Sequence, residues 1–147
     1  MKIVLNFLPL KSGGGLQVGL DFLRQAQRCG DKHDWFLVAT EGTPLAQTVG
    51  TKNVHVAAIV PRNLPARLWF EYIGCRSLLA QLRPDVIYTQ FGPHWPAAQT
   101  RHVVGCAYSN LLYPEIDFWG KLPFLQRMVR KLVDVERTRR LMTADHI

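Results

Sequence analysis

The sequence predicts an α/β domain with a Rossmann-like, mostly parallel sheet and helices on both faces. Short apolar runs, which suit strands buried on both faces, alternate along the chain with segments of helical spacing. The 147 residues are enough for one domain with a sizeable core. Because 48% of the residues are hydrophobic and 20% are charged, the composition argues against disorder.

The first strand is expected at residues 1–8, which are apolar at nearly every position, and it ends at Pro9. Three consecutive glycines at 13–15 then favour a turn where the backbone can approach a ligand, because no Cβ stands in the way. Helical spacing follows over residues 16–29 and stops at Gly30, a favourable C-terminal cap. A strand, a glycine turn and a helix N-terminus in this order present backbone N–H groups to an anion such as phosphate.

The glycines do not complete a nucleotide motif. Gly13 and Gly15 supply the first two positions of the dinucleotide pattern G-x-G-x-x-G, but the third falls on Val18, and Gly19 is one residue late. A triphosphate-binding loop needs Lys-Ser after its glycines, whereas here residues 11–12 precede them. The turn therefore indicates either a ligand-facing corner or a plain connection between strand and helix.

The remaining elements follow from periodicity. Further strands are predicted at residues 35–39, 53–60, 85–89 and 101–107. Helices are predicted at 41–50, 66–82 and 124–142, with a short helical turn through Gln99. Residues 143–147 look like the start of another strand. The helix at 66–82 carries one apolar stripe at steps of three and four, made of Leu68, Tyr72, Cys75, Leu79 and Leu82.

Three segments are expected to meet in one crevice. In parallel sheets ligands bind outside the carboxyl ends of the strands, where the strand order reverses. The segments that leave the predicted strands there are 9–15, 90–96 and 108–120. These are also the stretches richest in glycine, proline, aromatic residues and histidine.

The opening strand–glycine–helix segment, the strand that begins Arg83-Pro84-Asp85-Val86-Ile87 and the strand at 103–107 resemble the N-terminal half of GT-B glycosyltransferases of the family 4 type. The resemblance covers almost the whole chain. It implies two Rossmann-like domains, of which the N-terminal one mainly binds the acceptor and the C-terminal one binds the nucleotide-sugar donor. We therefore expect 1–147 to be a single acceptor-side domain, cut before its last strand, without the donor domain and inactive alone.

The resemblance implies a retaining enzyme of surface polysaccharide or glycolipid synthesis, acting on a sugar or lipid-linked acceptor. The nucleotide sugar is a co-substrate, and no cofactor or metal is implied. The alternative is a non-catalytic Rossmann-like module that binds a nucleotide or a protein. An oxidoreductase ranks third, because the dinucleotide fingerprint is broken.

Candidate catalytic residues are His94, Tyr108 and Glu115. His94 follows a strand end and its pKa range suits acid–base work, although a loop histidine that caps a helix or faces water fits the pattern equally well. Many family members place a histidine where this chain has Tyr108. With Ser109 and Asn110, that residue offers hydrogen-bonding groups to an acceptor, or makes an ordinary turn. Glu115 could orient an acceptor hydroxyl or be an exposed loop acid.

Candidate substrate-binding residues also include Trp95, whose ring could stack on a sugar or plug the core beneath its loop. The glycines of the turn, Gly13, Gly14 and Gly15, belong to the same set. The three cysteines stand in apolar contexts and suit small buried side chains better than a disulfide or a metal site: Cys29, Cys75 and Cys106.

The charge is unevenly distributed. The formal net charge is +7, and residues 121–140 alone hold seven basic and two acidic side chains. This segment is either a solvated outer helix or a contact for an anionic membrane, in which each basic residue contributes about 1 kcal/mol. The membrane-contact candidates are Arg127, Arg130, Lys131 and Arg137. No nucleic-acid motif is present, so nucleic acid is not an expected partner.

The expected location is the cytoplasm, with peripheral contact on the inner face of the cell membrane. No apolar run reaches the ~18 residues of a membrane span. The apolar N-terminal stretch is too short for a signal peptide and lacks a small-residue cleavage site.

Overall fold

The computed structural model describes residues 1–28, 32–48, 50, 53–95, 100–113 and 115–147. Cys29, the predicted cap at Gly30 and the predicted helical turn through Gln99 lie outside these residues. The strands form one sheet in the order β3-β2-β1-β4-β5, and every neighbouring pair is parallel. Their bounds are β1 Lys2–Asn6, β2 Asp34–Thr40, β3 Val54–Val60, β4 Val86–Gln90 and β5 His102–Gly105.

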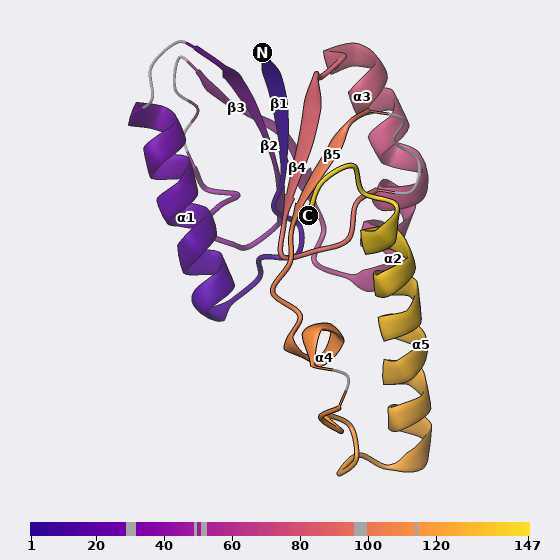
Figure 1. Cartoon of the computed structure of the whole chain (residues 1–147). Coiled ribbons are helices and arrows are strands. Elements are labelled where there is room, and N and C mark those ends of the chain that lie inside the picture. The colour runs from indigo at the N-terminus through magenta and orange to yellow at the C-terminus, as the bar shows by residue number, and fades with distance from the viewer. Residues whose placement is uncertain (29–31, 49, 51–52, 96–99, 114) are drawn as a thin grey trace.

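Helices cover both faces of the sheet, which confirms the predicted α/β, Rossmann-like fold. Helix α1 (Gly13–Arg28) packs on one face, and a continuous helical segment packs on the other (Figure 1). That segment consists of α2 (Leu64–Trp69), the π-helical η1 (Phe70–Gly74) and α3 (Cys75–Leu82). Each face has its own buried apolar cluster, so consecutive residues such as Val4 and Leu5 are both buried. This is why the strands are apolar at successive positions.

The strand order reverses between β1 and β4, and the ends of these two strands are tied together. The Asn6 amide donates a hydrogen bond of 3.1 Å to the Thr89 hydroxyl, and both side chains are buried. Beyond the strands, Pro9 packs so closely on Gly92 that a Cβ there would overlap the proline ring. The chain therefore leaves β1 and β4 side by side, at the topological switch point where such folds bind ligands.

The predicted helix at 41–50 is wrong for the described residues 41–48, which form successive turns. Their backbone bonds span three residues, as in Ala46 N to Thr43 O (3.0 Å) and Gln47 N to Pro44 O (3.2 Å). Leu45 is fully buried in the cluster beneath α1. Thr43 is buried as well, and its hydroxyl donates to the Thr40 carbonyl oxygen. Successive turns bury these two side chains, so the segment does not need a helix to do so.

The long helix starts two residues earlier than predicted and changes its inward face at η1. Leu68 and Tyr72, expected in the apolar stripe, are 41% and 40% exposed, whereas Glu71 is 4% exposed. Cys75 and Leu79 are buried as predicted. A π-helical turn contains more residues than an α-helical one, so the residues before it are rotated relative to the residues after it. The rotation turns Glu71 inward.

The last part of the chain extends away from the sheet. A short helix α4 (Ser109–Leu112) follows β5, and α5 (Phe124–Met142) runs beside residues 108–113 and 115–123, with most of its length beyond the sheet (Figure 1). The bounds of α5 are those predicted. His146 forms a parallel bridge with Val103, next to β5, so the strand-like end of the chain begins to pair there. In the part of the chain that the structure describes, no helix has the length and apolar character needed to cross a membrane.

Candidate functional site

A groove of about 530 Å³ lies at the carboxyl ends of the strands, between α2 and α5. All three segments expected there contribute to it. Pro9 comes from the end of β1, Phe91 and Pro93 from the end of β4, and Tyr108 from the end of β5. The predicted convergence of the strand ends on one crevice is therefore present.

The groove has apolar walls and a charged floor. The walls are Leu64 and Leu68 on α2 together with Leu132 and Val133 on α5. The charged lining residues come from both helical segments: Arg67, Glu71, Glu136, Arg137 and Arg140. A site of this kind combines apolar contact area with a few fixed donors and acceptors, which is the usual composition of a small-molecule site.

Arg140 is the centre of the charged floor. Its guanidinium donates to Glu71 Oε2 at 3.0 Å, to Glu136 Oε1 at 2.9 Å and to the Tyr72 hydroxyl at 2.5 Å. Glu71 also accepts from Arg67 Nε at 2.7 Å. Because Glu71 and Arg140 are only 4% and 7% exposed, each needs its partners to remain charged. The network fixes α5 against η1 and so fixes the width of the groove.

Two ionisable side chains in and beside the groove, Glu136 and Lys11, have shifted pKa values. The hydrogen bond from Arg140 lowers the pKa of Glu136, which is therefore ionised near neutral pH. Lys11 follows the β1 end and donates to the Arg62 carbonyl oxygen at 3.3 Å. Its pKa is lowered by burial and by the positive charges of Arg67 and Arg62. Lys11, Arg62 and Arg67 therefore lie near one another beside the end of β1, with Glu71 as the nearby opposite charge.

Tyr108 lines the groove at the end of β5. Its hydroxyl donates to the Phe91 carbonyl oxygen at 3.1 Å, and the guanidinium of Arg137 lies 4.8 Å from its ring centre. Burial raises the pKa of the phenol, so Tyr108 is neutral and suits the holding of a ligand better than the removal of a proton. Ser109 and Asn110 begin α4 and do not line the groove.

The three glycines form the first turn of α1 and not a separate loop, because the helix begins at Gly13. Gly13 has a φ of +69°, which a glycine adopts without strain. A Cβ on Gly13 or Gly14 would meet no atom within 4 Å, whereas one on Gly15 would lie 3.3 Å from the Phe91 ring. The helix N-terminus is thus open, and the Phe91 ring lies between it and the groove.

His94 contacts the end of α5 and is not among the groove-lining residues. Its Nδ1 lies 2.6 Å from the Arg140 carbonyl oxygen, and its ring centre is 5.0 Å from that of His102. Burial lowers the pKa of His94, which favours the neutral ring. In this position His94 holds the C-terminal end of α5, so the structure gives no support to the predicted acid–base role.

Trp95 is a core residue. Its side chain is fully buried and packs edge-on against Phe70 at 5.4 Å between ring centres. The prediction that Trp95 stacks on a sugar is therefore wrong, because its ring has no exposed face. Of the two predicted roles, the structure shows the core plug.

Glu115 lies away from the groove. It lines a separate hollow of about 270 Å³ with Asp117, Trp119, Arg127 and Lys131, beside the first turns of α5. The structure therefore does not bring Glu115 together with Tyr108 in one site. The predicted catalytic set is divided among three places.

Sequence reasoning missed the charged floor of the groove. Arg67 and Glu71 stand four residues apart on a helix, a spacing at which an ion pair could have been predicted. No local signal predicts that Arg140 meets Glu71, because 69 positions separate them. The groove residues that the sequence did not assign to the crevice are Leu64, Arg67, Leu68, Glu71, Leu132, Val133, Glu136, Arg137 and Arg140.

The described residues contain no group of three His, Cys, Asp or Glu side chains arranged to hold a metal ion. No protein-family model matches this chain, and no curated protein or solved structure is significantly similar to it. The functional argument therefore depends on the groove itself.

Proposed function

We propose that this chain is the acceptor-binding domain of a nucleotide-sugar-dependent, retaining glycosyltransferase of surface polysaccharide or glycolipid synthesis. The observation that carries the proposal is the single groove lined from the ends of β1, β4 and β5, at the switch point of a parallel sheet. The resemblance of three short motifs to family 4 glycosyltransferases supports the same function.

The groove offers the groups that a sugar needs. Its guanidinium groups donate hydrogen bonds and the ionised carboxylate of Glu136 accepts them, so neighbouring hydroxyls of one sugar can each find a partner. The ring of Tyr108 and the leucine walls supply apolar contact for the C–H faces of the sugar or for an attached hydrocarbon. The chain would thereby orient the acceptor hydroxyl toward a donor, and such positioning contributes much of the catalysis.

The open N-terminus of α1 has a separate role in this proposal. Its first turn carries no acidic residue, and its backbone N–H groups and helix dipole favour an anion. A donor diphosphate placed there would lie next to Phe91, one side chain away from the groove. The proposal thus assigns the acceptor to the groove and the departing phosphate to Gly13–Gly15.

An NMR titration of the chain tests this assignment. Alkyl hexopyranosides, added to concentrations on the order of 10 mM, should shift the amide resonances of Tyr108 and Leu68, since a lone half-site binds weakly. Nucleotide sugars should instead shift those of Gly14 and Gly15. Arg137→Gln should weaken the sugar binding about fivefold, which is the effect of one lost hydrogen bond.

Arg76→Gln is the matched control, because Arg76 is exposed on α3 and does not line the groove. The proposal is wrong if no hexopyranoside shifts the groove resonances. If mononucleotides without a sugar shift the groove resonances and sugars do not, the chain is a nucleotide-binding module.

A further inference from the structure

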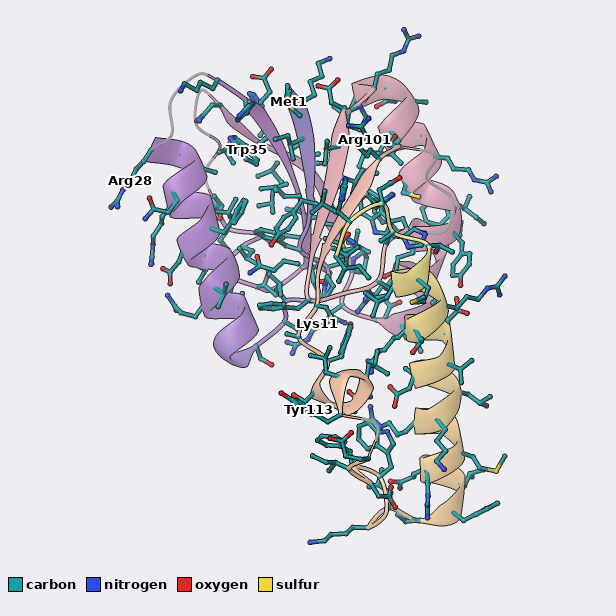
Figure 2. The ribbon with its side chains drawn as sticks, viewed as in Figure 1. Met1, Lys11, Arg28, Trp35, Arg101 and Tyr113 are labelled. Atoms are coloured by element: carbon teal, nitrogen blue, oxygen red, sulfur yellow. The ribbon has the colours of Figure 1, made fainter. Side chains whose placement is uncertain are left out.

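Helix α5 exposes a continuous apolar line that nothing in the described structure covers. Its first four members follow steps of three and four residues, Met142 follows seven residues after the fourth, and all five are 47–77% exposed. We call them the α5 seam: Leu125, Met128, Leu132, Val135 and Met142. Phe124, beside the start of the seam, is 77% exposed. Figure 2 shows side chains of α5 projecting away from the rest of the chain.

The polar side of α5 faces the protein. Arg127 pairs with Asp117 at 3.3 Å, and Asp134 accepts a 2.7 Å hydrogen bond from the Trp119 indole. Arg130 lies over the Trp119 ring at 5.4 Å. The usual arrangement of a surface helix is therefore reversed, because α5 turns its charges toward residues 108–119 and its apolar line toward solvent.

This arrangement changes the expected membrane contact. Three of the four basic residues predicted to meet lipid, Arg127, Arg130 and Arg137, have partners within the protein. Lys131 and Arg139 are exposed and take part in no ion pair among the described residues, and they line a shallow hollow together with Val135 of the seam. Two free cations therefore border the apolar line.

Charge decides what kind of surface can cover the seam. α5 carries six basic and two acidic residues, a net charge of +4. A second copy that packed along the same line would bring an equal positive charge beside it, which opposes association. An anionic lipid surface attracts that charge and accepts the apolar side chains.

We propose that the α5 seam is a peripheral membrane-binding surface, in which the apolar side chains of the seam enter the interface and Lys131 and Arg139 contact anionic headgroups. Phe118, in the segment before α5, and Phe124, its first residue, are both exposed and would enter with the seam. The seam shares Leu132 with the groove, but its contact with lipid requires no sugar in the groove, so the inference does not depend on the proposed function.

Vesicle co-sedimentation of the full chain tests the proposal. The chain should bind vesicles of phosphatidylcholine with phosphatidylglycerol, and bind vesicles of phosphatidylcholine alone much more weakly. Replacing both Leu125 and Met128 with Gln should lower binding tenfold or more, because two apolar side chains are lost from the interface. Lys131→Gln should lower binding about fivefold, and only to the anionic vesicles.

The matched control replaces Val56 and Ile59 with Gln, since both are exposed on β3, at the opposite edge of the sheet from β5. Circular dichroism checks that each variant is folded. If the variant with Gln at both Leu125 and Met128 binds vesicles as well as the unchanged protein does, the proposal is overturned. The proposal is also wrong if the chain binds no vesicle and light scattering finds it to be a dimer. If replacing Leu125 and Met128 with Gln then makes that dimer monomeric, a second copy of the chain covers the seam.

Discussion

His102 shows how one buried side chain constrains this fold. It is 3% exposed, its Nδ1 bonds to the Thr100 carbonyl oxygen at 2.9 Å, and its Nε2 has no hydrogen-bond partner among the described residues. Burial, together with the neighbouring His94, lowers its pKa from 6.5 to about 4. The Asp145 carboxylate, which binds the His102 backbone N–H at 2.6 Å, opposes this shift only in part. The folded protein therefore holds His102 neutral.

The free energy of unfolding should fall as the pH drops from about 6.5 to about 4. In this range the unfolded chain protonates His102 and the folded chain does not, so acid favours unfolding, by at most about 3 kcal/mol. His102→Asn should reduce this loss, as measured by urea denaturation at several pH values. His55→Asn, at an exposed position on β3, is the control. An unchanged pH dependence in His102→Asn would contradict the argument.

At the scale of the element, the helical segment of residues 64–82 builds one wall of the groove. Its start is fixed by Asn63, whose side-chain oxygen accepts from the Ala66 N–H at 2.8 Å, and by Pro65 in the first turn. The π-helical turn η1 then rotates the segment so that Glu71 reaches Arg140. The cap and the π turn together decide which side chains of α2 face the groove.

Asn63→Ala should lower the free energy of unfolding by about 1 kcal/mol, because the capping acceptor is lost. Asn63→Asp keeps an acceptor at this position and should restore most of the stability. Urea denaturation measures both variants. Equal stability losses in the two variants would show that the cap contributes little.

At the scale of the whole molecule, the chain divides into a sheet with two covered faces and an extension made by residues 108–135. The sheet has a buried cluster on each face, whereas the first turns of α5 are joined to the neighbouring segment by contacts such as the hydrogen bond from Trp119 to Asp134. Few buried apolar contacts mean low local stability. The extension should therefore open more easily than the sheet.

Amide hydrogen exchange should show this difference. Amides of β1 and β4 should exchange slowest, near the rate set by global unfolding, and those of residues 124–135 at least tenfold faster. Anionic vesicles should slow exchange in residues 124–135 and leave β1 unchanged. Uniform protection across α5 and β1 would contradict the division.

The sequence by itself determined the parallel α/β sheet, the bounds of α5 and the meeting of three strand ends in one groove. Each follows from local information: apolar runs specify strands buried on both faces, and parallel strands place their carboxyl ends at one edge. The position of Tyr108 in the groove was therefore predictable, since it follows directly from the end of a strand.

Only the tertiary structure decided which side chains share the site. His94, Trp95 and Glu115 stand near strand ends in the sequence, yet they lie against α5, in the core and in a separate hollow. The charged floor joins Glu71 to Arg140 across 69 positions, and the α5 seam faces solvent because the charged side of the helix binds residues 108–119. The spacing of apolar residues in the sequence indicates that a helix has an apolar face and a polar face, but packing against distant segments decides which of the two is buried.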